Sequence, residues 1–286
     1  MNILMQGMRP KTLVAAIIPP LTASGLYFSQ SIHYDYTILS LCLLLALCIQ
    51  IATNFYNDAI DYKKGADKDR VGPKRVSNEL NVKKIFRWGH LFIMAAFFVG
   101  VPLMLKGGWP IALLGLVSMF LAYGYTGGPF PLAYLGLGEL FVFLFFGLVA
   151  TMGSFYLMAE SLNHQVFLLA CANGLLSCAL IAINNLRDKE KDKVVDKNTL
   201  AVKMTPGVYH KLLDLFTFGP YFIILYFFVF INLKFVVVLL AVKFAHQTRF
   251  IIHHHEKPSE LNRALESAGK HLFAFGLLFW LVCLWI

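Results

Sequence analysis

One polar stretch of the chain follows directly on a long apolar run and places acids and amides at helical spacing. Asn54, Asp58 and Asp61 fall at positions i, i+4 and i+7, so in a helix they share one face. Asn57 lies beside them. Carboxylates at the mouth of a membrane helix are costly unless a cation holds them. The spacing therefore indicates a site that binds positive charge.

A second stretch repeats this pattern farther along the chain, again at the end of an apolar run. Its polar residues recur every four positions, at Asn184, Asp188, Asp192 and Asp196, and so share one helical face. Mg²⁺ binds through a few carboxylate oxygens together with water and substrate phosphates. Two facing clusters of this kind predict a divalent-metal site and a diphosphate bridged by the metals. The predicted metal ligands and catalytic acids are Asp58, Asp61, Asp188 and Asp192.

Other polar side chains near the two clusters are candidates for contacting the diphosphate. The amides of Asn54, Asn57 and Asn184 could orient the carboxylates or reach the phosphates. The bases Arg70, Arg75 and Lys197 lie in register with the acids and could clamp phosphate oxygens. The competing interpretation is a pair of solvated helix ends with ion pairs at i, i+4 spacing. The remaining loop bases are interpreted as topology signals or lipid headgroup contacts.

The composition is that of a polytopic membrane protein of the all-α class. Of 286 residues, 58% are hydrophobic and 14% are charged, and the mean hydropathy is +0.65, which is too apolar for a soluble domain. The net charge of +9 lies in short segments between apolar runs, so nucleic acid is not an expected partner. The five cysteines lie in apolar runs without a CxxC motif and are interpreted as small buried hydrophobes. Met1 to Lys11 lacks a cleavable signal pattern.

Nine apolar segments are long enough to cross a bilayer at about 20 residues per span. They are residues 14–30, 37–57, 87–105, 109–126, 137–158, 166–186, 214–231, 234–250 and 269–286. Nearly all of the 25 Lys and Arg residues fall on one side of this zigzag. The positive-inside rule makes that side cytoplasmic. The N-terminus and both acid-rich loops are thus expected inside, and the C-terminus outside.

Between the fourth and fifth spans, Gly127, Gly128 and two prolines break the helix and would let backbone approach a ligand. Tyr125 and Tyr134 supply rings and hydroxyls there, and Glu139 follows at a helix start. A plain interhelical turn with interfacial aromatics is the alternative. The aromatic helix that follows suits a cavity for an isoprenoid chain.

Three consecutive histidines, His253 to His255, cannot all point at one ion from a helix, so a solvated cytoplasmic loop is favoured over a metal site. No nucleophile triad, Walker loop or dinucleotide fingerprint is present in the sequence.

Taken together, these motifs resemble the UbiA superfamily of intramembrane prenyltransferases, and within it the MenA family, which prenylates 1,4-dihydroxy-2-naphthoate in menaquinone synthesis. The resemblance runs from Arg9-Pro10-Lys11-Thr12, through both Asp motifs and YTGGPFPLAYLGLGEL, to Leu261-Asn262. The position of Asp67 after the first motif favours the naphthoate branch over the benzoate branch. The Tyr-x3-Lys element of some members is not matched, because Gly127 stands where the lysine would be.

The resemblance implies a single transmembrane domain over residues 1–286, with nine helices around a central cavity, in the bacterial cytoplasmic membrane. It implies Mg²⁺-dependent transfer of a polyprenyl group from its diphosphate to the naphthoate, with loss of CO₂. Asp67 joins the residues expected to bind diphosphate. Arg9, Lys11, Tyr125 and Tyr134 are expected near the acceptor. The alternatives are a homogentisate or hydroxybenzoate acceptor within the same superfamily, an ion or solute transporter, or an inert structural membrane protein.

Overall fold

The computed structural model describes residues 3–31, 34–65 and 81–286, and the elements within these ranges are all helical. This agrees with the expected all-α class. The elements are α1 (Ile3–Met8), η1 (Pro10–Thr12), α2 (Val14–Gln30), α3 (Tyr36–Lys63), α4 (Val82–Gly124), α5 (Leu132–Leu135), α6 (Gly138–Val142), the π-helix η3 (Phe143–Val149), α7 (Ala150–Ala159), α8 (His164–Val194), α9 (Leu200–Lys203), α10 (Pro206–Phe230), η4 (Leu233–Ala241), α11 (Val242–His254), η5 (Pro258–Glu260) and α12 (Leu261–Trp285).

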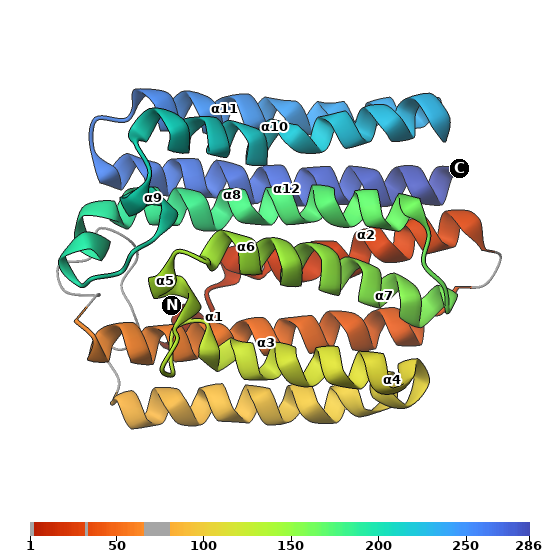
Figure 1. The fold of residues 1–286 in the computed structure, drawn as a ribbon. Helices are drawn as coiled ribbons and strands as arrows, with labels where there is room; N and C mark the ends of the chain where they lie inside the picture. The colour runs from red at the N-terminus through yellow and green to blue at the C-terminus, as the bar shows by residue number, and fades with distance from the viewer. Residues whose placement is uncertain (1–2, 32–33, 66–80) are drawn as a thin grey trace.

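The described residues contain seven helices that are long and apolar enough to cross a membrane, or eight if the bent pair formed by residues 4–12 and 14–30 counts as one span. The expected count of nine is not confirmed. The two segments expected at 87–105 and 109–126 both lie in α4, an element of 43 residues that contains two helices joined by a kink and that counts once. At Gly108 the backbone takes φ 70° and ψ −165°, a conformation that glycine adopts readily. The chain turns back there, so the two halves of α4 lie side by side (Figure 1).

The long helices run alongside one another, and both acid clusters fall at the same end of the bundle. The short elements α1, α5 and α9 gather at this end, where α3 and α8 finish (Figure 1). The C-terminus lies at the opposite end. The topology therefore brings together two stretches that are far apart in the sequence.

A large apolar core fills the bundle between α2, α8, α10 and α12. The rings of Phe227, Phe235 and Phe279 pack in its centre, with centroids 5.1 to 5.2 Å apart. Asn173 is a buried polar residue in this core. Its amide group donates to Thr22 Oγ1 at 2.8 Å and to Thr151 Oγ1 at 3.0 Å, so hydrogen bonds join α8 to α2 and α7, whereas Asn173 Oδ1 has no hydrogen-bond partner among the described residues.

The π-helix η3 packs very closely on α8. A Cβ atom added to Gly147 would lie 2.7 Å from Gly174 Cα and 2.8 Å from Ala170 O. Both are backbone atoms, which cannot move aside as a flexible side chain can. Only glycine at position 147 permits this approach.

Gly147→Ala should therefore destabilise the protein, by about 1–3 kcal/mol, because it overpacks a backbone contact. Gly207→Ala is the matched control, since a Cβ atom there meets nothing within 4 Å. Unfolding of both variants in detergent would be compared with that of the unmodified protein. Equal unfolding midpoints for the two variants would contradict the packing argument.

Candidate active site

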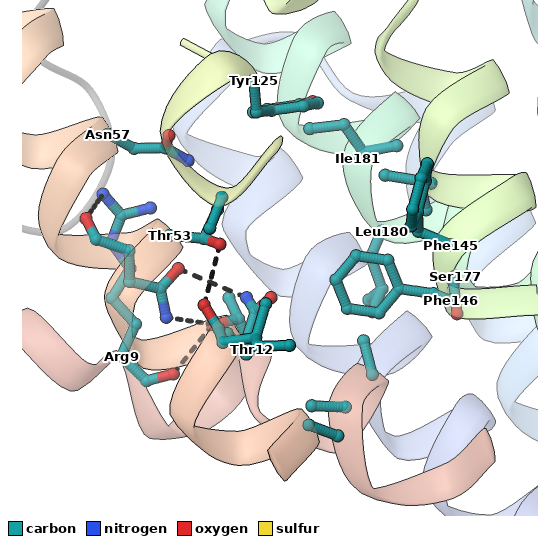
Figure 2. A pocket seen from close by; sticks show the side chains of 18 of the residues that line it. Arg9, Thr12, Thr53, Asn57, Tyr125, Phe145, Phe146, Ser177, Leu180 and Ile181 are labelled. Atoms are coloured by element: carbon teal, nitrogen blue, oxygen red, sulfur yellow. Dashed lines mark hydrogen bonds between the residues drawn. The ribbon is translucent and has the colours of Figure 1, made fainter. Parts of the chain in front are cut away.

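One cavity of about 1060 Å³ reaches into the bundle from the end that carries the two acid clusters. Residues of η1, α3 and α8 form its polar part, and apolar side chains of α4, α6, η3 and α7 form most of the rest. Figure 2 shows this division, with Arg9, Thr12 and Asn57 on one side and Phe145 and Phe146 on the other. The volume slightly exceeds the usual range for small-ligand pockets, about 300–1,000 Å³. The cavity thus suits a large ligand with one polar end.

The first acid cluster lines this cavity on α3 and is almost completely buried. Asp58 forms an ion pair with the guanidinium of Arg9, which comes from the turn between α1 and η1. The Asn54 amide donates to Met8 O at 2.9 Å and to Thr12 Oγ1 at 3.2 Å. These contacts tie the N-terminal segment to α3, and they place Arg9 against the metal-ligand candidate Asp58 rather than free to bind an acceptor.

Asp61, one helical turn farther on, accepts a hydrogen bond from the hydroxyl of Tyr134 at 3.1 Å. The Tyr134 ring also lies under Lys64 Nζ, at 3.8 Å from the ring centroid, and 5.7 Å from Lys197 Nζ. The Tyr134 carbonyl accepts from the Asn198 N–H at 3.0 Å. Tyr134 therefore connects the α3 cluster to the segment that follows α8. In this position it holds the Asp61 carboxylate by a hydrogen bond.

The second acid cluster lines the same cavity from α8. Arg187 holds both carboxylate oxygens of Asp188, at 2.8 Å from Nε and 2.6 Å from the second nitrogen. The same guanidinium donates to Asn184 Oδ1 at 2.5 Å and to Asn262 Oδ1 at 2.9 Å. This bidentate geometry is the strong form of an Arg–carboxylate pair. It fixes Asp188 and Asn184 on the cavity wall.

Lys197 reaches Asp192 because of how α8 ends. Asp196 has a left-handed φ of 53°, and the Lys197 N–H bonds back to Asp192 O at 2.8 Å, which is a Schellman-type cap. Lys197 Nζ then lies 3.3 Å from Asp192 Oδ1. Burial opposes the charge of Lys197, but Asp61, Asp192 and Asp188 outweigh it and raise the pKa of the lysine above its usual value.

The expectation that Asp196 extends the second acid stripe is wrong. The helix ends at Val194, so Asp196 lies in the cap and not on the helical face that carries Asp188 and Asp192. The other predicted acids and amides, Asn54, Asn57, Asp58, Asp61, Asn184, Asp188 and Asp192, all line the cavity together with Lys197. Asp67, Arg70 and Arg75 lie outside the described residues.

The two remaining residues expected near an acceptor line the cavity at different places. Lys11 lies at its rim, where Nζ pairs with Glu266 Oε2 at 3.3 Å. Tyr125 follows α4 and faces the cavity interior (Figure 2). Burial raises the pKa of the Tyr125 hydroxyl, with Glu139 and Asp61 adding to the effect, so this hydroxyl stays protonated and can donate a hydrogen bond to a ligand.

Glu139 has a larger structural role than its place at a helix start indicated. It is buried, and Oε1 accepts from the amide of Asn185 at 2.9 Å and from the Tyr209 hydroxyl at 3.1 Å. Its second carboxylate oxygen has no hydrogen-bond partner among the described residues. Asn185 lines the cavity next to Asn184. Glu139 thus connects α6 to the acid-bearing part of α8, a contact without a signal in the sequence spacing.

The histidines His253 to His255 do not form the solvated loop expected from the sequence. His253 and His254 occupy the last turn of α11 and are exposed, and His255 follows as its cap. Helix α11 ends at His254, four residues beyond the apolar segment expected at 234–250.

The donor set of the cavity fits a hard cation that binds together with a ligand. Among the described residues, no three His, Cys, Asp or Glu side chains converge as a complete metal cage. Mg²⁺ does not require one, because it takes one or two carboxylates and completes its shell with water and substrate phosphates. Asp192 also presents a buried carboxylate oxygen that lacks a hydrogen-bond partner in the described part of the chain. The carboxylates of both clusters thus suit this role.

Comparison with known sequences finds relatives that extend over most of the chain. The 1,4-dihydroxy-2-naphthoate octaprenyltransferase of Haemophilus influenzae is 38% identical over 218 residues, which cover 72% of this chain and 71% of the relative. The enzyme of the same name from Escherichia coli is 35% identical over 209 residues, covering 70% of this chain and 68% of the relative.

Comparison with solved structures finds the same fold. A UbiA homolog from Aeropyrum pernix K1, in its apo form, superposes with a TM-score of 0.70 at 14% identity, over 93% of this chain and 94% of the other. A UbiA homolog from Archaeoglobus fulgidus bound to GPP and Mg²⁺ gives a TM-score of 0.67 at 16% identity, over the full length of both. The model of the UbiA prenyltransferase family matches residues 17–275. The chain therefore belongs to the UbiA prenyltransferase family.

Proposed function

We propose that this protein is an integral membrane enzyme that transfers a polyprenyl group from its diphosphate to 1,4-dihydroxy-2-naphthoate, with loss of CO₂ and diphosphate, to give the quinol form of demethylmenaquinone in menaquinone biosynthesis. The observation that carries the proposal is a single cavity that joins two carboxylate clusters, with Asp58, Asp61 and Asp192 buried, to a long apolar interior. A prenyl diphosphate has the same division between a polar head and an apolar tail. The relatives named as naphthoate octaprenyltransferases support the choice of acceptor.

The diphosphate head belongs at the acid clusters. Asp58, Asp61, Asp188 and Asp192 would hold Mg²⁺ there, and bound Mg²⁺ would neutralise the diphosphate and favour its departure as a leaving group. Arg187 and Lys197 would also bind the diphosphate directly. Their N–H groups can donate to phosphate oxygens as well as to the acids they pair with. Asp67, Arg70 and Arg75 are assigned to the same head on sequence grounds.

The acceptor is assigned to the region between the N-terminal turn and the α4–α5 connection. Lys11 at the rim carries a charge that attracts the naphthoate carboxylate. The protonated Tyr125 hydroxyl can donate to a ring oxygen inside the cavity. Arg9 contributes indirectly, because its ion pair with Asp58 holds the first acid cluster in place.

The apolar part of the cavity is assigned to the prenyl tail. Phe145 and Phe146 present aromatic faces along it, and an aromatic face stabilises a nearby positive charge. Loss of the diphosphate leaves such a charge on the allylic carbon, which the electron-rich naphthoate ring then attacks. We assign this polar mouth to the cytoplasmic side of the bacterial inner membrane, and the distribution of Lys and Arg along the sequence supports this orientation.

Asp58→Asn and Asp188→Asn should each lower the transfer rate by about two orders of magnitude or more, as loss of a preorganised charge does at other active sites. The rate would be measured on purified protein with Mg²⁺, a polyprenyl diphosphate and the naphthoate. Asp214→Asn is the control, because Asp214 lies on α10 and does not line the cavity. Its carboxylate Oδ1 pairs with Arg249 Nε of α11 at 3.3 Å. Near-normal turnover in both cavity variants would remove the metal assignment.

Removing divalent cations with a chelator should abolish transfer, and adding Mg²⁺ should restore it. Without the metal, the negative charge of the departing diphosphate would not be neutralised. Thermal unfolding of the chelated protein serves as the control. Full activity in the chelator with an unchanged unfolding midpoint would contradict metal use.

A panel of acceptors should separate the naphthoate reaction from its relatives. We expect product and equimolar CO₂ from 1,4-dihydroxy-2-naphthoate, and little product from homogentisate or 4-hydroxybenzoate, with identification by mass spectrometry. Preferential prenylation of either of the other two acids would reassign the acceptor. Solute uptake into proteoliposomes, with no prenylated product from any acid, would support a transporter instead.

A further inference from the structure

The cavity extends from the acid clusters to side chains near the turn of α4. Leu103 and Ile111 lie on either side of the Gly108 turn, and Leu157 of α7 belongs to the same apolar cluster as Leu103, against which Ile111 packs. All three side chains line the cavity, and Leu103 and Leu157 are buried. This end of the cavity lies opposite the acid clusters, because α4 turns back at the other end of the bundle (Figure 1). We call these three side chains, Leu103, Ile111 and Leu157, the floor of the cavity.

The distance from mouth to floor is long. Asp58 and Cys42 both line the cavity and both lie on α3. At a rise of about 1.5 Å per residue, the helix between them spans roughly 24 Å. The side chains along this axis therefore limit the length of a prenyl tail that follows it.

One wall of the cavity carries a regular stripe. Phe141, Phe145, Val149, Gly153 and Leu157 recur at every fourth residue, and all of them line the cavity. In a regular α-helix of 3.6 residues per turn, a spacing of four drifts steadily around the axis. The wider turn of the π-helix over residues 143–149 rotates the other way and partly cancels the drift. The π-helix therefore keeps the stripe facing the cavity over its full depth.

Gly153 is the single gap in this stripe, between Val149 and Leu157. A Cβ atom added to Gly153 would meet no atom within 4 Å, so the space in front of this residue is open. Its backbone is ordinary α-helix, so neither a turn nor a positive φ requires glycine here. Close helix packing does not require it either, in contrast to Gly147.

We infer that Gly153 determines the length of the prenyl donor that the enzyme accepts, by leaving open the deep part of the cavity above the floor formed by Leu103, Ile111 and Leu157. This inference rests on the proposed function, since it assigns the tail to the cavity. A side chain at position 153 would fill the open space and stop a long tail, while a short tail would end before reaching it. The alternative is a tail that leaves sideways into the bilayer and never reaches Gly153.

The test compares Gly153→Leu with Gly207→Leu. Both glycines have open space at the Cβ position, but only Gly153 lines the cavity. Product formation and equilibrium binding would be measured with geranyl diphosphate, which carries two isoprene units, and with octaprenyl diphosphate, which carries eight. We expect Gly153→Leu to weaken octaprenyl binding and turnover about tenfold or more, because the added side chain would occupy the space that the long tail fills. Geranyl diphosphate should bind and react as before, and Gly207→Leu should change neither.

Leu157→Ala tests the same inference in the opposite direction, because it deepens the floor and should improve the relative use of donors longer than octaprenyl. Unchanged octaprenyl binding in Gly153→Leu, or an equal loss with both donors, would overturn the inference. Binding is read without turnover, so it separates the two proposals. A protein that forms no product but binds the donors with the expected length dependence would contradict the proposed function alone.

Discussion

Burial of acidic groups at the end of a membrane bundle is the constraint on which the rest of the structure depends. An unpaired charge removed from water is strongly unfavourable, whereas a well-paired one is tolerated. Three acids of the cavity accordingly meet a base, one from the N-terminal turn and two from the end of α8 and its cap. Asp58 meets Arg9, Asp188 meets Arg187, and Asp192 meets Lys197. These contacts hold the N-terminal turn and the cap of α8 against the cavity, so the acids position the elements that surround them.

The second constraint is that one cavity has to change from polar to apolar along its length. The long helices provide this change, because α3 and α8 carry acids at one end and apolar side chains over the rest. The wall opposite α3 needs a continuous apolar stripe, and the π-helix supplies it at the point where Gly147 lets η3 approach α8. The irregularity in the helix and the close contact between helices thus fall in the same segment of the cavity wall.

Local spacing could be predicted from the sequence because it depends on neighbouring residues only. The positions i, i+4 and i+7 put Asn54, Asp58 and Asp61 on one face, and the structure has them on one cavity wall. The same argument was wrong for Asp196, because a cap with a left-handed residue ends α8 two residues earlier. Long-range partners gave no such signal. The bond from Asn185 to Glu139 joins helices that only the folded chain brings together.

The helix count differs for a related reason. Hydropathy separates two apolar segments around Gly108, but it does not reveal whether the helical hydrogen bonding stops between them. In the structure the two segments are helices joined directly at Gly108 without an intervening loop, and together they make up α4. The fold class and the acid clusters were therefore readable from periodicity and composition, whereas boundaries and partners depended on backbone geometry at a few residues.

The charge balance of the cavity bears on how a diphosphate could be accommodated. The acids that line the cavity are nearly matched by bases; the acids are Asp58, Asp61, Asp188, Asp192 and Glu266, and the bases are Arg9, Lys11, Arg187, Lys191, Lys197 and Lys270. A mouth near neutrality would become strongly negative if a diphosphate alone were added, and a buried excess charge is unfavourable. Cations that arrive with the diphosphate remove this excess while the carboxylates supply oxygen ligands. The balance of acids and bases thus matches a metal–diphosphate unit better than either component by itself.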